Sequence, residues 1–249
     1  MNEQALREQI CLIGRLMHER QYIDGASGNI SARLDAERVL ATPSGLAKGF
    51  MTPEQLMIVN LAGERVDRPT AANAELRPTS ELLMHLECYR QRADVQGVVH
   101  AHPQCAVALT LVGYDFQRCV LPEVIIMLGL IPTAPYSTPS SAENRDAISA
   151  LVREHDAILL AHHGSLTVAQ TVWDAYLRLE SLEHNARILY MAEQLGGARM
   201  LEAPQVEKLL AIRRRLGLAR PGDEARFGQA LGVSHGLFNK APLDSTAGS

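Results

Sequence analysis

Aromatic residues are scarce in this chain, at 4% of its 249 residues, and it has a single tryptophan. No apolar run approaches the roughly 20 residues that a membrane-spanning helix needs, and the sequence does not open with the pattern of a signal peptide. The formal net charge of -4 gives no excess of basic residues for nucleic acid or an anionic membrane surface. We therefore expect a cytoplasmic protein with neither nucleic acid nor a membrane as its partner.

Cysteine is sparse as well. The four cysteines, Cys11, Cys88, Cys105 and Cys119, show no CxxC spacing of the kind found in redox or zinc motifs. Scattered single cysteines are typical of reduced thiols that pack as small hydrophobic side chains. The sequence therefore predicts no disulfide framework, which suits the cytoplasm.

Hydrophobic residues make up 47% of the chain, enough for a sizeable core, and their spacing predicts the elements of one domain. Hairpin-joined strands in the first half, with helices throughout, favour an α/β fold with a mostly antiparallel sheet between helical layers. Residues 121–135 are predicted to form a buried loop and strand, and residues 219–249 an irregular tail. Helices are expected at residues 3–20, 80–92, 103–111, 142–154, 170–195 and 204–216, and strands at 30–33, 38–41, 56–61, 157–160, 166–168 and directly before His100.

A buried strand is predicted to end in a pair of histidines. Val98 and Val99 lead into His100-Ala101-His102, and β-branched residues before a polar pair are typical of a strand leaving the core. Side chains alternate along a strand, so His100 and His102 point to the same face about 7 Å apart. Two imidazoles so placed can bind one divalent ion, and zinc accepts nitrogen ligands readily. A lone HxH also arises by chance, so the pair needs further support.

That support comes from a second apolar strand. Residues 157–160 are followed by His162-His163-Gly164. Three histidines leave one position of a zinc site open, as a catalytic zinc needs, with a carboxylate available as a displaceable fourth ligand. The residues alone do not decide which of His162 and His163 is the ligand.

Thr79-Ser80-Glu81 stands where a helix is predicted to begin. Hydroxyl side chains cap free N–H groups at a helix N-terminus, and the same end attracts anions. Glu81 also has a purely structural explanation, because the helix dipole favours a carboxylate in the first turn. His85, one turn further on, is expected to be structural or to support a ligand. The metal pair and this helix start together indicate a site for a phosphorylated or otherwise anionic substrate.

Two loops of small residues are predicted to meet at the open end of the first hairpin. The first strand follows Gly28-Asn29, and the second is followed by Thr42-Pro43-Ser44-Gly45. Backbone N–H groups in Gly-rich turns of this kind form concave anion-binding sites. Ordinary turn chemistry explains either loop taken alone.

The order of these motifs resembles the class II aldolase/adducin family: Gly-Asn-x-Ser, Thr-Pro-Ser-Gly, Ser-Glu at a helix start, HxH and then HHG. The resemblance covers roughly residues 5–216, and we expect a class II aldolase/adducin-like domain over residues 1–218 before the tail. It implies a three-layer α/β/α fold around a central, mostly antiparallel sheet. It also implies a ring-shaped homotetramer with its sites at subunit interfaces and one metal ion per subunit, usually zinc, with manganese and cobalt left open.

The family's site residues carry over position by position. His100 and His102 match two metal ligands and His163 matches the third, so that His162 is expected to face the other way. Glu81 matches a carboxylate that binds the metal in the resting site and becomes the catalytic acid/base once substrate displaces it. The residues that match the family's phosphate-binding set are Gly28, Asn29, Ser44, Gly45, Thr79 (a serine in many members) and Ser80.

The chain departs from the family's aldolases at the aldehyde end of the substrate. Those aldolases have one tyrosine after the metal pair and another near the C-terminus. The matching positions here, Leu121 to Ile126 and Leu216, hold no tyrosine. A group from residues 136–141 or 219–249 is expected to replace them.

The resemblance implies a metal-dependent aldolase that reversibly cleaves a small sugar phosphate, through an enediolate stabilised by zinc, into dihydroxyacetone phosphate and a short aldehyde. A dehydratase or decarboxylase on a related sugar phosphate is an alternative, because the same stabilisation serves each reaction. Epimerases of the family carry aspartate in place of Glu81, which disfavours that alternative. A non-catalytic, adducin-like binding module is disfavoured because this chain keeps the three histidines and the glutamate.

Overall fold

The computed structural model describes residues 2–233, which contain one seven-stranded sheet. Its strand order is β3-β2-β1-β4-β7-β6-β5, and neighbouring strands are antiparallel except for the parallel pair β5 and β6. The predicted α/β fold with a mostly antiparallel sheet is confirmed. The strands are β1 (Asn29–Arg33), β2 (Arg38–Ala41), β3 (Met57–Asn60), β4 (Gly97–Ala101), β5 (Thr133–Ala134), β6 (Ala157–Leu160) and β7 (Gly164–Ala169).

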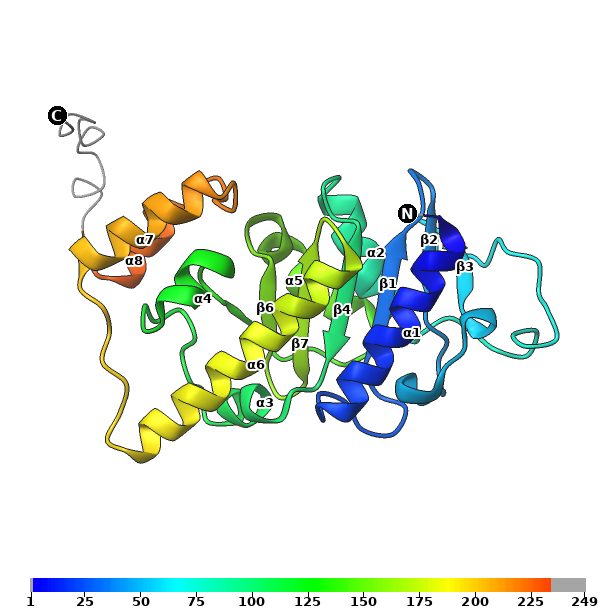
Figure 1. Cartoon of the computed structure of the whole chain (residues 1–249), viewed down its shortest axis with the longest axis horizontal. Coiled ribbons are helices and arrows are strands. Elements are labelled where there is room, and N and C mark those ends of the chain that lie inside the picture. Colours follow the sequence, from blue (N-terminus) through cyan, green and yellow to red (C-terminus); the bar gives the residue numbers. More distant parts are fainter. Residues whose placement is uncertain (1, 234–249) are drawn as a thin grey trace, which may run out of the picture.

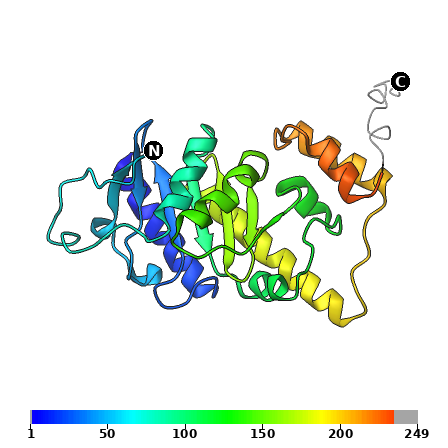
Figure 2. The ribbon, with the colours of Figure 1, turned by 180° about the vertical axis from the view of Figure 1, so that it is seen from behind.

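Helices cover both faces of the sheet, which gives three layers (Figures 1 and 2). Strand β4 shows why both faces are covered: Val99 and Ala101 pack with residues of α1 and α6, whereas Val98 packs on the other face with residues of α2 and α5. The described helices are α1 (Glu3–Glu19), α2 (Leu82–Gln91), α3 (Gln104–Leu111), α4 (Pro122–Met127), α5 (Ala142–Glu154), α6 (Val172–Gln194), α7 (Ala203–Arg215) and α8 (Asp223–Ala230), with short 3-10 turns η1 (Lys48–Phe50) and η2 (Pro53–Gln55).

The first helix follows directly from its sequence pattern. Asn2 caps α1 by accepting a hydrogen bond from the Ala5 N–H at 2.8 Å. Ile10, Ile13 and Met17 recur at helical spacing and are fully buried against the sheet. The same helix packs against η1, so it also holds the segment that follows β2 in place.

No helix among residues 2–233 is long and apolar enough to cross a membrane. All four cysteines are free thiols, and three of them, Cys11, Cys88 and Cys119, are buried. Burial raises the pKa of the Cys11 and Cys119 thiols to about 11. These cysteines therefore act as small hydrophobic side chains, as the sequence predicts.

The region predicted as a buried loop and strand, residues 121–135, contains a helix as well. Pro122 begins α4 in its first turn, where proline is favourable because its missing N–H is not needed. The strand part of the prediction corresponds to the two residues of β5. The pattern of the short apolar run Val124 to Met127 is compatible with a strand and with a helical turn. Packing of Ile125 against α7 stabilises the helix.

The C-terminal segment differs more clearly from the prediction of an irregular tail. Residues 223–230 form α8, whose Phe227 is fully buried against Val206 and Leu210 of α7. The prediction was wrong for this helix because tertiary packing outweighs its weak helical periodicity. The rest of the predicted tail, residues 234–249, lies outside the described residues.

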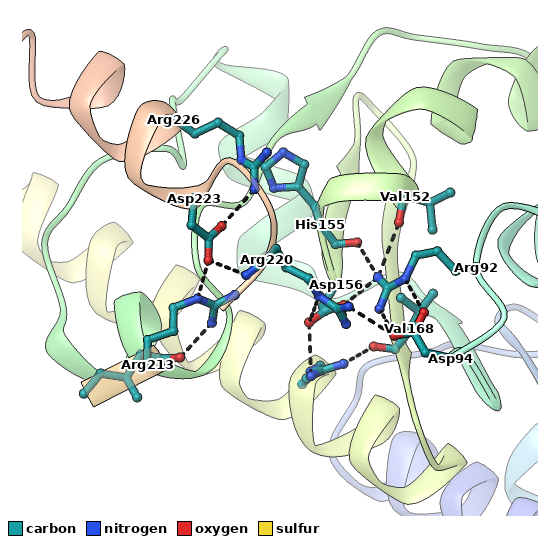
Figure 3. A network of polar contacts seen from close by, with 12 residues as sticks. Arg92, Asp94, Val152, His155, Asp156, Val168, Arg213, Arg220, Asp223 and Arg226 are labelled. Atoms are coloured by element: carbon teal, nitrogen blue, oxygen red, sulfur yellow. Dashed lines mark hydrogen bonds and ion pairs between the residues drawn. The ribbon is translucent and has the colours of Figure 1, made fainter. Parts of the chain in front are cut away.

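A network of arginines and aspartates joins the C-terminal helices to the sheet (Figure 3). The carboxylate of Asp156, directly before β6, is 2% exposed and pairs with three guanidinium groups: Arg92 at 2.6 Å, Arg220 at 2.7 Å and Arg178 at 3.1 Å. Arg220 lies between α7 and α8 and also pairs with Asp94. Burial raises the pKa of Asp156, but the three cations outweigh burial and leave this pKa below its ordinary value.

Replacing Asp156 with alanine is expected to lower the free energy of unfolding by about 3–5 kcal/mol, because three guanidinium groups lose a shared buried partner. Chemical denaturation followed by circular dichroism measures the loss. Asp146→Ala is the matched control, since Asp146 forms an exposed pair with Arg145 on α5 and such pairs contribute little. Equal stability of the two variants would contradict a structural role for the network.

Candidate metal centre

Strand β4 carries His100, and His102 directly follows its last residue, so both histidines lie at one end of the strand. In its pairing with β7, His100 lies opposite Leu166 and Ala101 lies opposite Ser165. The His100 ring is fully buried, and its Nδ1–H donates to the backbone oxygen of Ser165 at 2.9 Å. That bond leaves Nε2 of His100 to face Nε2 of His102, which lies 3.0 Å away.

The turn between β6 and β7 supplies a third imidazole. Residues 161–163 form the three-residue loop of this hairpin. The ring of His163 lies 4.8 and 5.0 Å from the two rings of the β4 pair. His162 has a left-handed φ of 60° and is exposed, with its ring 6.3 Å from that of Tyr136. His163 thus faces the pair, and His162 faces away.

Gly164, which follows this loop, is required by the close approach of the two histidine-bearing segments. A Cβ atom at this position would lie 2.4 Å from the backbone oxygen of Ala101, 2.9 Å from Cδ2 of His102 and 3.1 Å from Cε1 of His100. Any side chain would force the rings apart, so the glycine of the HHG motif is part of the geometry of the centre.

The carboxylate of Glu81 completes the cluster. Glu81 is the N-cap residue of α2, but its side chain makes no capping hydrogen bond. Its Oε2 lies 3.0 Å from Nε2 of His100, and its Oε1 lies 3.3 Å from Nε2 of His163. One ligand atom from each of Glu81, His100, His102 and His163 lies within 4.8 Å of the others. The side chain of Glu81 therefore points to the histidines and does not cap the helix, so the residue belongs to the site.

The chemistry of these donors fits a divalent cation. Burial and then the neighbouring His100 ring lower the pKa of His102 and of His163 to about 4, so both are neutral at neutral pH. Burial raises the pKa of Glu81, but His100 and Asn29 outweigh it and keep the carboxylate ionised. These acceptors converge on a point that calls for a positive charge, and a divalent ion satisfies all four at once. The group can therefore hold a divalent metal ion.

A chain of buried hydrogen bonds supports the carboxylate. The Nδ2 amide of Asn29 donates to Oε2 of Glu81 at 2.9 Å, and Oδ1 of Asn29 accepts from Nε2 of His85 at 2.5 Å. Nδ1 of His85 accepts from Oγ of Ser31 at 2.7 Å, and this Oγ lies 2.8 Å from the hydroxyl of Tyr89. All hydrogen bonds of this chain then donate in the same direction, from Tyr89 towards Glu81. His85 therefore supports the site, as expected, and the Asn29 side chain contacts the Glu81 carboxylate.

Asn144 is a residue that the sequence did not indicate. It is 1% exposed on α5, where its Nδ2 donates to Oε1 of Glu81 at 3.4 Å and its Oδ1 accepts from Oγ of Ser137 at 3.3 Å. Its helix was predicted, but no motif or period relates it to a carboxylate 63 positions earlier. The amides of Asn29 and Asn144 therefore hold the two carboxylate oxygens between them.

Three loops of small residues meet next to Glu81. Thr42 and Ile30 exchange two hydrogen bonds at 3.1 Å, which joins the start of β1 to the loop after β2. The Ser44 N–H donates to the Arg77 oxygen at 2.9 Å, and the Thr79 N–H donates to the Thr42 oxygen at 3.1 Å. The predicted meeting of the first two loops is confirmed, and the helix start joins them. Of the six residues predicted to bind phosphate, three are exposed (Ser44, Gly45 and Ser80) and three are buried (Gly28, Asn29 and Thr79).

The fold and this cluster agree with what comparison with known proteins finds. A sequence model of the Class II Aldolase and Adducin N-terminal domain family matches residues 8–190. The chain belongs to this family.

Particular relatives carry more than one activity in their names. The chain is 31% identical over 193 residues to 3-oxo-tetronate 4-phosphate decarboxylase of Escherichia coli K12, covering 76% of this chain and 88% of the relative. It is 32% identical over 183 residues to L-fuculose phosphate aldolase of Methanococcus maripaludis, covering 74% of this chain and 95% of the relative. Among solved structures, YgbL of Escherichia coli, named as a candidate aldolase/epimerase/decarboxylase, matches with a TM-score of 0.75 and 30% identity over 83% of this chain and 98% of that one.

Proposed function

We propose that this protein is a metal-dependent lyase that breaks a carbon–carbon bond in a small sugar phosphate. The observation that carries the proposal is the position of Glu81, whose carboxylate meets two of three converging imidazoles and is otherwise held by the neutral amides of Asn29 and Asn144. A carboxylate held by neutral donors can leave the cluster and act as a base. Relatives named as aldolases and as decarboxylases support this class, because both reactions leave a carbanion next to a carbonyl.

Three histidines, His100, His102 and His163, would hold the metal ion, with Glu81 as a displaceable fourth ligand. A bound ion supplies Lewis-acid stabilisation of negative charge on the substrate. Nitrogen ligands with one carboxylate suit zinc, and cobalt or manganese can use the same ligands. We propose one zinc ion per subunit.

Glu81 is the proposed catalytic acid/base. Its Oε1 has the longer amide contact, 3.4 Å to Asn144 against 2.9 Å from Oε2 to Asn29, so Oε1 is the oxygen we expect to take up and return the proton. When the carboxylate leaves the cluster, the Nδ2 group of Asn29 loses its acceptor and becomes available to a substrate oxygen. This reconciles the observed contact of Asn29 with its predicted place in the phosphate-binding set.

The phosphate is proposed to bind where the three small loops meet. Ser44, Gly45 and Ser80 present exposed groups there, while Gly28 and Thr79 shape the loops from within. Backbone N–H groups and hydroxyls in such turns bind anions well. Binding the phosphate at a distance from the reacting carbon turns its affinity into orientation of the substrate.

Aldol cleavage to dihydroxyacetone phosphate and a short aldehyde is the reaction that we propose first. Tyr136 is our candidate for the aldehyde side, since it is 65% exposed and faces His162 in the loop that carries His163. Leu216, the other position without the tyrosine, lines a cavity of about 360 Å³ together with residues of α6, including Arg178. This cavity is away from the histidine cluster.

Incubation of the zinc-loaded protein with dihydroxyacetone phosphate in deuterated water tests the proton-transfer step. We expect one hydroxymethyl proton to exchange stereospecifically, and NMR measures this exchange. Exchange occurs because the carbanion of the aldol reaction forms from dihydroxyacetone phosphate as well as from the sugar phosphate. Protein stripped of metal is the control and should not exchange the proton. No exchange with one ion bound per subunit would point to another donor substrate, and no bound metal at all would favour a binding module.

Decarboxylation is the second candidate, supported by the identity of 31% to a 3-oxo-tetronate 4-phosphate decarboxylase. In that reaction the bond to a carboxylate carbon breaks, carbon dioxide leaves, and Glu81 would take a proton from water and pass it to the remaining carbon. Release of carbon dioxide from 3-oxo-tetronate 4-phosphate, with no condensation of dihydroxyacetone phosphate with short aldehydes, would replace the aldolase proposal by this one.

We further propose that the protein is a cytoplasmic homotetramer with its sites at subunit interfaces and a family domain over residues 1–218. Contacts between subunits would cover exposed apolar side chains such as Val112 at the end of α3, which is 76% exposed, and Leu195 at the end of α6, which is 88% exposed. The family match over residues 8–190 lies inside the proposed domain.

A further inference from the structure

Lys48 places a charged group inside the protein that none of the roles above uses. It belongs to η1 and is only 2% exposed. Its Nζ donates to the backbone oxygen of Ala26 and to that of Leu46, each at 2.7 Å. Hydrogen bonds from a charged donor are about twice as strong as neutral ones. Two backbone carbonyls are therefore bound firmly to one ammonium group.

These carbonyls belong to two of the loops at the proposed phosphate site. Ala26 lies two residues before Gly28, and Leu46 directly follows Gly45. Both glycines have a left-handed φ, 70° at Gly28 and 75° at Gly45, so each loop turns sharply beside the carbonyl that Lys48 binds. The lysine thus links two loops that are separate in the sequence and sets the distance between them.

The main chain that carries Lys48 has little freedom to move. Helix α1 packs directly against it, and a Cβ atom at Gly14 of α1 would lie 2.4 Å from the Lys48 backbone oxygen and 3.4 Å from its Cβ. Contact this close fixes the start of the side chain, and the two hydrogen bonds fix its end. The ammonium group is therefore in position before any ligand binds, which lowers the cost of ordering the site.

The charge of Lys48 lacks an anionic partner. Among residues 2–233 it forms no ion pair, and Glu81 acts on it only through space. Burial lowers its pKa to about 8, against a smaller rise from Glu81, so the group is mostly protonated at neutral pH. A buried cation without a partner is unfavourable, and the arrival of an anion nearby offsets that cost.

We propose that Lys48 is a positioning residue for the substrate's phosphate, which holds the loops at Ala26 and Leu46 in place and supplies the positive charge behind them. This inference rests on the proposed function, which puts a phosphate at these loops. In the free protein, the carboxylate of Glu81 is the negative charge that interacts with Lys48. When the substrate displaces Glu81, the phosphate becomes the main negative charge near the lysine.

Binding of inorganic phosphate to the metal-loaded, full-length protein tests the proposal, because it requires no knowledge of the complete substrate. Calorimetry of Lys48→Met is expected to give a Kd about ten- to a hundredfold higher than that of the wild type. Methionine keeps an unbranched stem of similar length but has neither the charge nor the donors. With a phosphorylated substrate, the same variant should raise KM while kcat changes much less, since no group at the reacting carbon is altered.

Two further variants separate the proposal from a general loss of structure. Lys48→Gln keeps a hydrogen-bond donor without the charge, and it should bind phosphate as weakly as Lys48→Met. Ile13→Val removes one methyl group from the core packed around η1 and should keep the wild-type Kd. Metal content and circular dichroism should match in all four proteins.

The outcomes distinguish this inference from the proposed reaction. Equal phosphate affinity in the wild type and Lys48→Met, or full affinity in Lys48→Gln, overturns the role of the lysine and leaves the reaction untouched. Weakened phosphate binding in both lysine variants supports the role even if the wild type exchanges no proton and releases no carbon dioxide. A wild type that binds no phosphate overturns the inference together with the phosphate site.

Discussion

Replacing Glu81 with glutamine is expected to slow proton exchange into dihydroxyacetone phosphate about 10²–10⁴-fold while leaving the metal bound. Glutamine has nearly the same shape, and its one amide oxygen can still accept a hydrogen bond from Asn29 or from Asn144, but its amide cannot take up a proton. The metal should remain because the three histidines supply the other ligand atoms. NMR exchange rates and metal analysis measure the two effects separately.

Glu87→Gln is the matched control for this experiment. Glu87 lies on the same helix, α2, and is also largely buried, but it accepts hydrogen bonds from Ser149 and Gln91 and not from the histidines. It should leave the exchange rate unchanged. If Glu81→Gln exchanges protons as fast as the wild type, another group must be the base.

Replacing His163 with alanine is expected to weaken metal binding by more than about 100-fold and to abolish exchange. Loss of a residue that merely supports a ligand already costs about 10- to 100-fold in affinity, and a direct ligand contributes more. Removing this imidazole leaves the β4 pair and Glu81 without their third histidine. Competition with a coloured chelator measures the affinity.

His162→Asn is the control one residue away. The His162 ring is exposed and faces Tyr136, so it should contribute nothing to metal binding. Asparagine is chosen because φ is 60° at this position, a left-handed conformation that asparagine adopts more easily than most residues. Equal metal loss in both variants would mean that the turn, and not the His163 imidazole, is what the metal requires.

The histidine cluster could be predicted because its signals are local in the sequence. Strand alternation alone puts His100 and His102 on one face, and an apolar strand before His163 marks where the next segment leaves the core. The meeting of the loops followed from hairpin geometry. The order of the seven strands brings these pieces to one place, and no local pattern contains that order.

The parts that could not be predicted depend on side chains from distant segments. Asn144 reaches Glu81 from a helix 63 positions away, and nothing in its own neighbourhood marks it. Periodicity does not show the approach of backbone segments that requires Gly164 either. Helix α8 was missed for a related reason, since Phe227 is buried by residues of other segments, among them Ile125 of α4 and Val206 and Leu210 of α7.

The origin of the cluster in three separate segments also bears on how the protein folds. The histidines of β4 meet the β6–β7 turn only after β4 has paired with β7, a contact between His100 and Ser165, 65 residues apart. Long-range pairings slow folding and are completed late. An ion that needs the whole set therefore recognises the native state, so it slows unfolding and leaves the folding rate nearly unchanged. Metal supply would then govern the lifetime of the folded protein, and not the speed at which it forms.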